Sequence, residues 1–294
     1  METHRIHPEL LEHPVRMLVV GCGGTGSAIV SGLPYLHQSL VAWGHPGGLH
    51  VTLLDGDVIS PANCVRQPFS RSEVGLNKAV VLINRLNLFW GLQWEAIPAH
   101  LKPGTFISRN YTGDGLRAHI VLGCLDTRAA RAAIRDAVSN ESSTSYLLDL
   151  GNNSDTGQFI LGEPLNKRNR RSRLRLRTAG ELFPEICDPA LDDAHEPSCS
   201  AVEALERQGP FINSTLAQHA LALLARLFRY GEISYHGAFI NLVSGATSVI
   251  RIDPVCWKRI RRMNSRAVSL HQRQEDSTDG RANQRGIDGP NRRA

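Results

Sequence analysis

The sequence predicts an α/β protein with a Rossmann-like, doubly wound and mostly parallel sheet. Two observations lead to this fold class. Short apolar segments alternate with amphipathic segments over residues 15–163, and a glycine-rich turn joins the first such pair. Alternating strands and helices are typical of βαβ units, in which a helix links two parallel strands.

Six apolar segments are expected to be strands of this sheet. Each is short and bounded by Gly, Asp or Pro, which is typical of buried strands. They cover residues 15–21, 48–55, 92–101, 118–126, 145–151 and 157–163. Between them, apolar residues recur at helical spacing and predict helices at 25–36, 75–90 and 127–140.

The alternation stops after Pro164, where we expect a long crossover loop region at 165–210. Residues 166–178 contain seven Lys or Arg and no acid, and an acid-rich stretch follows them. The alternating residues 173–177 are a candidate edge strand. Order is expected to resume with a helix at 211–230 and two C-terminal strands near 237–243 and 247–253.

The domain organisation follows from this pattern. We predict one folded domain over residues 1–264 and a disordered basic tail at 265–294, where apolar residues are nearly absent. The net charge of the chain is +5, but residues 258–294 alone hold ten Lys or Arg and four Asp or Glu, a net of +6. The rest is therefore near −1, which does not favour a nucleic-acid partner.

The remaining composition points to a cytoplasmic protein. No segment of about 20 residues is apolar enough to predict a membrane span, and the N-terminus lacks the apolar core of a secretion signal. The six cysteines are scattered without a CxxC pair. This spacing favours neither a disulfide framework nor a four-cysteine zinc site, so no structural zinc is expected.

The turn after the first strand has the pattern G-x-G-x-x-G. Glycines at these positions let the backbone approach a phosphate without a Cβ clash, and the following helix offers free N–H groups and a partial positive charge. Because the turn lies between a predicted strand and a predicted helix, it indicates a nucleotide site. The glycines are Gly21, Gly23, Gly24 and Gly26.

Charged residues after the second and fourth strands favour Mg-ATP over a nicotinamide cofactor. Asp55 ends the second strand, where dinucleotide-binding folds place a carboxylate on the ribose. The cations Arg66 and Lys78 would offset the charge of a triphosphate, and Asn63 can hydrogen-bond to its oxygens. Asp126 ends the fourth strand, and a carboxylate there would need Mg²⁺ between itself and the phosphates.

These residues together resemble the ThiF/MoeB/ubiquitin-activating-enzyme superfamily of adenylyltransferases. The resemblance covers residues 15–165, and the C-terminal part resembles the ThiF-family branch found in the PRTRC genetic system. The matching positions are G-x-G-G-x-G (Gly21 to Gly26), D-x-D (Asp55, Asp57), N-x-x-R-Q (Asn63, Arg66, Gln67), Gly75, Lys78 and D-x-x-x-x-R (Asp126, Arg131).

The resemblance implies that the chain binds Mg-ATP and adenylates the C-terminal glycine of a ubiquitin-like or sulfur-carrier-like protein. It implies a homodimer and, in some members, a conjugating protein as a further partner. By position, Asp55 would hold the ribose, while Asn63, Arg66 and Lys78 would hold phosphates. Asp126 would ligate Mg²⁺. Asp57 and Gln67 match the family pattern with a loop-shaping role.

Some members of this superfamily transfer the acyl group to a cysteine of the crossover loop. Cys199 is the best candidate here, since it lies in a polar segment before a predicted helix, where a thiol pKa is lowered. Cys187 is the second candidate, and an incidental loop cysteine remains an alternative for both. Three other functions stay open: a non-catalytic nucleotide-binding scaffold, an NAD-linked oxidoreductase, and adenylation of a small molecule or tRNA base.

Overall fold

The computed structural model describes residues 2–109, 115–172, 174–192 and 209–263 of the 294-residue chain. The chain divides into two compact units, Met1–Ile252 and Asp253–Ala294. The described part of the second unit is a helix at 254–263. The tail predicted to be disordered lies outside the described residues. None of the described helices is both long and apolar enough to cross a membrane.

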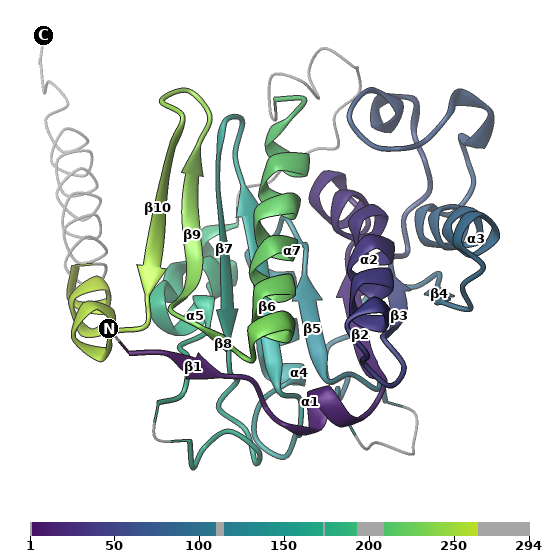
Figure 1. The fold of residues 1–294 in the computed structure, drawn as a ribbon. Coiled ribbons are helices and arrows are strands. Elements are labelled where there is room, and N and C mark those ends of the chain that lie inside the picture. The colour runs from purple at the N-terminus through teal and green to yellow at the C-terminus, as the bar shows by residue number, and fades with distance from the viewer. Residues whose placement is uncertain (1, 110–114, 173, 193–208, 264–294) are drawn as a thin grey trace, which may run out of the picture. The chain divides into compact units, whose positions relative to one another are not determined.

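An eight-stranded mixed sheet forms the centre of the first unit (Figure 1), in the order β10-β9-β7-β6-β5-β2-β3-β4. The five strands from β6 to β4 are parallel, and β7, β9 and β10 continue the sheet in antiparallel fashion. The predicted fold class is confirmed. The strands are β2 (Val15–Val20), β3 (Leu49–Leu54), β4 (Glu95–Ile97), β5 (Ile120–Gly123), β6 (Tyr146–Asn152), β7 (Thr156–Gly162), β9 (Tyr235–Asn241) and β10 (Ala246–Arg251).

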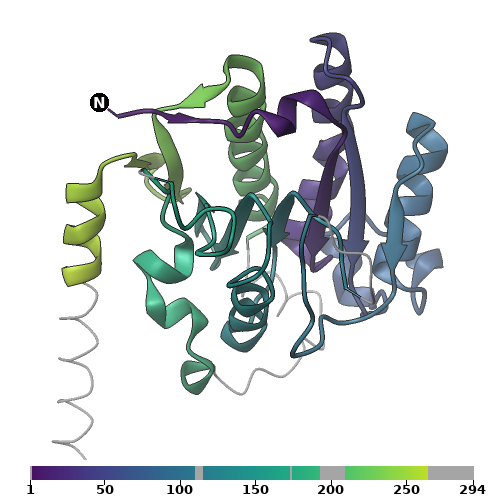
Figure 2. The ribbon, with the colours of Figure 1, turned by 90° about the horizontal axis from the view of Figure 1, so that it is seen from below.

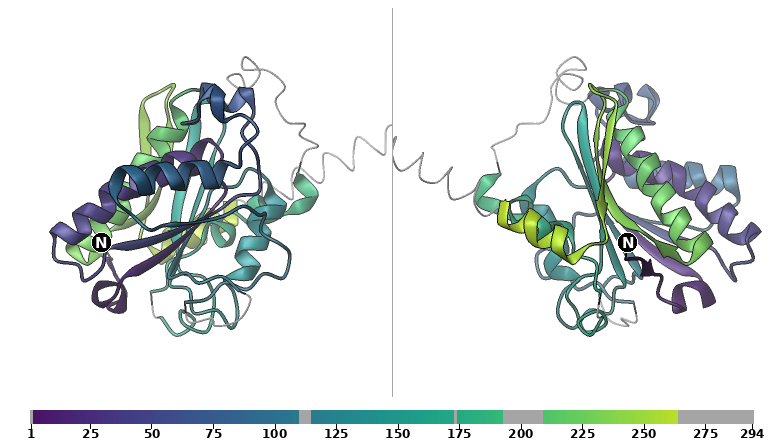
Figure 3. Two further views of the ribbon diagram at one scale, coloured as in Figure 1. Left: turned by 90° about the vertical axis from the view of Figure 1, so that its right-hand side faces the viewer. Right: turned by 60° about the vertical axis from the view of Figure 1, so that its left-hand side comes forward.

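Helices cover both faces of this sheet (Figure 2 and Figure 3). On one face lie α2 (Gly24–Ala42), α3 (Lys78–Trp90) and α7 (Ile212–Tyr230), and on the other lie α4 (Arg128–Ala137) and the short α5 (Ala179–Leu182). The α4 face encloses a core that includes Leu18, Val121 and Ile134. Because both faces are covered, the central strands β2 and β5 are mostly apolar, as the sequence indicated.

Polar capping residues begin two of the helices near the carboxyl edge of the sheet. Asn77 caps α3 by accepting a hydrogen bond from Val80 N at 3.0 Å, and Thr127 caps α4 by accepting one from Ala130 N at 3.3 Å. Before α3 and after α4 the chain forms short 3-10 helices. These are η1 (Pro61–Val65), η2 (Arg71–Glu73), η3 (Pro184–Cys187) and η4 (Pro189–Leu191).

The N-terminal segment forms structure that the sequence did not predict. β1 (His4–Arg5) pairs antiparallel with β8 (Glu232–Ile233), and α1 (Glu9–Glu12) follows. Two-residue strands are too short to show a hydrophobic period. The segment is held instead by buried polar contacts, with His7 Nε2 2.9 Å from Glu163 Oε1 and His4 Nε2 2.7 Å from the hydroxyl of Tyr146.

The edge strand expected at 173–177 is wrong for its described residues, 174–177, which have no strand structure. Arg175 does not alternate outward but is buried, and its Nη1 donates to Glu163 O at 2.6 Å and to Glu181 Oε2 at 2.8 Å. The contacts of the Arg175 guanidinium therefore stabilise a non-strand conformation, although Arg and Leu alternate in this segment.

Candidate active site

The glycine-rich turn lies between β2 and α2, at the carboxyl edge of the parallel strands. Gly21 has a φ of +96°, and a Cβ there would lie 2.4 Å from Cys124 O. A Cβ at Gly26 would lie only 2.0 Å from Gly21 O. Close backbone packing therefore requires glycine at both positions, whether or not a ligand is bound.

The two middle glycines of the turn differ from each other. A Cβ at Gly24 would lie 2.5 Å from the side-chain nitrogen of Asn213, whereas nothing lies within 4 Å of the corresponding point at Gly23. Gly23 is also the N-cap of α2, with an ordinary φ of −72°. The open space at Gly23 therefore faces the free N–H groups of a helix N-terminus, where an anion is stabilised.

Asp55 follows β3 directly and is almost buried, with 8% of its surface exposed. Its Oδ2 accepts a hydrogen bond from Cys22 N at 2.5 Å, and its Oδ1 accepts one from Asp57 N at 2.8 Å. Burial raises the pKa of this carboxyl, and the two backbone donors oppose that effect. Asp55 thus ties the glycine turn to the next loop, and a ribose hydroxyl would share its remaining lone pairs.

Asp57 has a partner that the motif alone does not reveal. Its Oδ2 lies 3.0 Å from Lys78 Nζ, while its Oδ1 lies 3.7 Å from His100 Nε2. The Lys78 side chain is buried, whereas that of Asp57 is half exposed. An ammonium has three donors, so Lys78 can keep this contact and still bind a phosphate oxygen.

The predicted phosphate ligands Asn63 and Arg66 lie on or next to η1. Asn63 Oδ1 accepts from Ser60 N at 2.8 Å, so its oxygen serves the local turn and only its amide nitrogen could bind a phosphate. Arg66 is partly buried. Burial lowers its pKa, and the nearby carboxylate of Asp126 opposes that shift, which brings these two predicted residues together across the site.

Gln67, the residue after Arg66, is 92% buried, and no described residue hydrogen-bonds to its Oε1. Its backbone N–H donates to Asn63 O at 2.9 Å. The backbone of Gln67 therefore helps to hold the turn that carries Asn63 and Arg66, and a loop-shaping role of its side chain stays a prediction.

Asp126 lies in the loop between β5 and α4 and is exposed. This loop is held by Arg131, whose Nε donates to Leu125 O at 3.1 Å and whose Nη1 donates to Asp149 Oδ1 at 2.8 Å. The Arg131 guanidinium is thus engaged in hydrogen bonds within the protein. Its part in the D-x-x-x-x-R pattern is to position the loop on which Asp126 stands.

Asp192 is a contact at this edge that the sequence did not reveal. Its Oδ1 accepts from Arg128 N at 2.7 Å and its Oδ2 from Ala129 N at 2.9 Å, so it caps α4 two residues after Asp126. The crossover region is thereby attached beside the predicted metal ligand. A single acid in an acid-rich stretch gives no sequence signal for such a cap.

The predicted thioester cysteines differ in what the structure says of them. Cys199 lies outside the described residues. Cys187 is buried next to Gly180, and burial raises the pKa of its thiol to about 11. A thiol with so high a pKa is a poor source of thiolate at neutral pH, so Cys187 does not suit an acyl-accepting role.

Metal ligands are few at this edge. The described residues contain no group of three or more His, Cys, Asp or Glu side chains that could hold a metal ion. Magnesium bound with a nucleotide needs only one or two protein carboxylates, since phosphate oxygens and water complete its shell. Asp126, exposed and beside Arg66, fits this requirement as a protein ligand.

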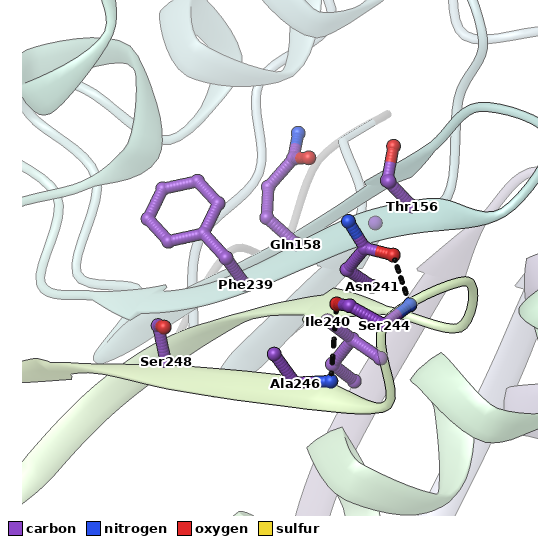
Figure 4. A pocket seen from close by; sticks show the side chains of 9 residues that line it. Thr156, Gln158, Phe239, Ile240, Asn241, Ser244, Ala246 and Ser248 are labelled. Carbon is purple, nitrogen blue, oxygen red and sulfur yellow. Dashed lines mark hydrogen bonds between the residues drawn. The ribbon is translucent and has the colours of Figure 1, made fainter.

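A pocket of about 330 Å³ lies on the antiparallel strands β7, β9 and β10 (Figure 4). Two rows of side chains from paired residues line it on one face, since alternate residues of a strand face the same side. The first row is Thr156, Asn241 and Ala246, and the second is Gln158, Phe239 and Ser248. Ser244, in the β9–β10 turn, completes the polar rim.

The second row leads from this pocket toward Asp126. Gln158 pairs with Gly151 of β6, and a Cβ at Gly151 would meet both Gln158 Nε2 at 2.8 Å and Arg131 Nη2 at 2.3 Å. Arg131 in turn holds Leu125, the residue before Asp126. The two side chains therefore approach each other only because position 151 is glycine.

Comparisons with known proteins bear on the family and the fold of the chain. A family model described as "ThiF family" matches residues 9–243. No curated protein sequence matches the chain. Similar solved structures include PaaA (TM-score 0.52, 12% identity, covering 81% of this chain and 64% of that one). E. coli MccB with MccA-N7isoASN gives a TM-score of 0.52 at 18% identity, covering 82% and 66%.

E. coli MccB with ATP gives a TM-score of 0.50 at 16% identity, covering 84% of this chain and 66% of that one. At these identities the likeness concerns the fold. This chain spans slightly less than two thirds of the length of each of these structures.

Proposed function

The chain belongs to the ThiF family, and we propose that it is an adenylyltransferase that uses ATP to activate the C-terminal carboxylate of a peptide or protein. The observation that carries this proposal is that the loops after β2, β3 and β5 bring opposite charges to one edge of the parallel strands. Lys78, Arg66 and the N-terminus of α2 supply positive charge, while Asp55 and Asp126 flank them. A nicotinamide cofactor requires no such set of cations.

In the proposed reaction a substrate carboxylate oxygen attacks the α-phosphorus of ATP. The bond from that phosphorus to the bridging oxygen breaks, giving an acyl-adenylate and pyrophosphate. The backbone at Gly23 would bind phosphate oxygens, and Asp55 would accept a ribose hydroxyl. Arg66 and Lys78 would stabilise negative charge on the α-phosphate and on the departing pyrophosphate, so that catalysis rests on positioning and electrostatics.

Magnesium fits as a companion of the nucleotide. Asp126 would hold it, and when bound it would supply positive charge against the phosphate oxygens. Arg131 and Asp192 would fix the loop and helix end on either side of Asp126.

The pocket on β7, β9 and β10 would receive the substrate chain. An extended chain end needs polar partners and a place to lie, and the rows headed by Thr156 and Gln158 offer both (Figure 4). From there the end would pass Gly151 to reach Asp126. E. coli MccB has been solved with ATP and with MccA, which supports a site of this fold that takes a nucleotide and a second ligand.

We propose a ubiquitin-like or sulfur-carrier-like protein ending in glycine as the substrate. We further propose a homodimer, transfer of the acyl group to Cys199, a conjugating protein as a later partner, and membership of the PRTRC-system branch. The assignment of residues 1–264 to one adenylation domain belongs with these proposals.

Exchange of radiolabelled pyrophosphate into ATP tests the proposed function. The purified protein should catalyse exchange only when magnesium and a small glycine-terminated partner are both present. A partner amidated at its C-terminus is the matched control and should give no exchange. If ATP binds but no partner supports exchange, a non-catalytic scaffold is the better description, and tight NADH binding without ATP binding would favour an oxidoreductase.

A further inference from the structure

A second pocket lies at the opposite edge of the parallel strands, where they begin. It has a volume of about 400 Å³ and is lined by His13, Pro14, Arg16, His50 and His119. The strand β2 runs from this edge to the glycine turn. At about 3.3 Å per residue, the five residues from Arg16 to Gly21 place the two sites about 17 Å apart. The pocket is therefore separate from the candidate active site.

Backbone pairing of three adjacent strands arranges the basic side chains of this pocket in a row. Arg16 on β2 is the register partner of His50 on β3. On the other side, His119 precedes β5, and its Nδ1 accepts from Arg16 N at 3.0 Å. The backbone N–H of His119 also donates to Arg16 O at 2.9 Å. The backbone positions of Arg16, His50 and His119 are thus fixed by the sheet, while the side chain of Arg16 is exposed.

The ring of His119 is a hydrogen-bond donor in this arrangement. Because its Nδ1 accepts a backbone N–H, the proton of the neutral ring must be on Nε2. Burial, helped by Arg109 and Arg16, lowers the pKa of His119 to about 4. At neutral pH the pocket therefore contains a fixed imidazole N–H donor beside a guanidinium.

The carboxylates near this pocket are already engaged elsewhere. Glu9 pairs with Arg109 at 3.3 Å and with Arg168. Glu95 Oε1 lies 3.6 Å from His50 Nε2, on the far side of the row. Among the described residues, no carboxylate forms an ion pair with Arg16. Of the lining residues, His50 thus has a carboxylate partner, whereas neither Arg16 nor His119 forms an ion pair with a carboxylate of the described chain.

We propose that this pocket binds a small organic phosphate. A guanidinium presents donors in a planar fork that matches phosphate oxygens, and imidazole N–H groups add further donors. The volume lies within the range of small-molecule sites and exceeds what one phosphate group needs. Pro14, which lines the pocket, gives an apolar wall for the organic part of the ligand.

Titration followed by imidazole NMR tests this proposal. Phenyl phosphate, inorganic phosphate and benzoate are added separately to the full-length protein, and the side-chain signals of His119 and His50 are followed. Phenyl phosphate should shift both signals saturably and bind more tightly than inorganic phosphate or benzoate. Arg16→Gln should weaken its binding about tenfold, the value expected for losing a charged hydrogen-bond donor.

Arg117→Gln is the matched control, because Arg117 is exposed and lies two residues before His119 but does not line the pocket. It removes the same charge from the same edge and should leave the affinity almost unchanged. Equal weakening by both variants would show attraction by general charge and would overturn the proposal. Shifts that never saturate would do the same, and benzoate binding as tightly as phenyl phosphate would contradict the phosphate assignment.

Discussion

The parallel and antiparallel halves of the sheet contribute different things to the candidate site. In the parallel half, the loops after β2, β3 and β5 carry Gly23, Asp55 and Asp126, and each residue lies within three residues of the end of its strand. In the antiparallel half, a pocket is assembled from residues of β7, β9 and β10 that are as far apart as Gln158 and Ser248. Motifs of nearby residues thus define the proposed nucleotide site, whereas strand register defines the proposed substrate face.

This difference has a physical origin. The carboxyl ends of parallel strands meet at one edge, so a residue that follows a strand is brought to that edge wherever it lies in the chain. No such rule holds for an antiparallel face, because turn lengths and strand register decide which residues become neighbours on it. Variants in the two halves should therefore have separable effects on nucleotide and on substrate.

The largest effect is expected for Asp126→Ala in the parallel half. Loss of the proposed magnesium ligand should lower pyrophosphate–ATP exchange by about 10²–10³-fold, as for other preorganised charge contacts. The fold should be intact because Asp126 is exposed. Asp136→Ala, which removes an exposed acid near the other end of α4, is the control and should retain exchange. Full activity of the Asp126 variant would remove the metal assignment.

Two glycines of the same turn, Gly23 and Gly26, should separate effects on folding from effects on binding. In Gly26→Ala the new Cβ would lie 2.0 Å from Gly21 O, so unfolding free energy should fall by about 3 kcal/mol. Gly23→Ala meets no atom within 4 Å and should change stability by only about 0.5 kcal/mol. Its methyl group would nevertheless occupy the space proposed for phosphate.

Chemical denaturation and ATP calorimetry on both variants measure these two effects. ATP affinity of Gly23→Ala should fall roughly tenfold through loss of a backbone contact to a charged group. Unchanged affinity would place the phosphates elsewhere on the turn.

Much of the parallel half could be predicted from the sequence. Gly21 and Gly26 predict the turn because no other residue fits there, and apolar segments predict the strands β2 and β5. What could not be predicted are contacts made through backbone groups. Asp55 bonds to Cys22 N, and Asp192 bonds to the start of α4, and a backbone N–H is the same in every residue except proline. The motif predicts that Asn63 binds a phosphate, but it does not reveal that the side-chain oxygen accepts from Ser60 N within the turn, which leaves the amide nitrogen as the donor.

The antiparallel half contains a buried titrating group with a measurable effect on stability. His236 of β9 is fully buried, its Nδ1–H donates to Leu161 O at 2.8 Å, and burial lowers its pKa to about 4. Between this value and the ordinary pKa of about 6.5, the unfolded chain binds the proton and the folded chain does not. The folded state therefore loses stability as pH falls from about 6.5 to about 4.

The His236→Asn variant should remove this dependence. A shift of that size corresponds to about 3 kcal/mol, so the decrease in unfolding free energy over this pH range should be smaller by roughly that amount. Urea denaturation at several pH values measures it. His219→Asn on the exposed side of α7 should leave the wild-type pH dependence in place. An unaltered slope in the His236 variant would mean that other groups cause it.

The smallest effect is expected at the substrate pocket, and it gives the sharpest separation of the two halves. Ser248 and Thr247 are adjacent exposed residues of β10, and they point to opposite faces of the sheet. Ser248→Trp would fill the pocket and should raise the KM for the partner about tenfold, a change of about 1.4 kcal/mol.

Thr247→Trp places the same ring on the other face and should leave the KM for the partner unchanged. Neither variant should alter ATP affinity, since the nucleotide site depends on the loops of the parallel strands. If Thr247→Trp raised the KM as much as Ser248→Trp, the partner would bind the tip or edge of the hairpin and not its pocket face. If Ser248→Trp weakened ATP instead, the two halves would not be separable and the substrate path past Gly151 would be wrong.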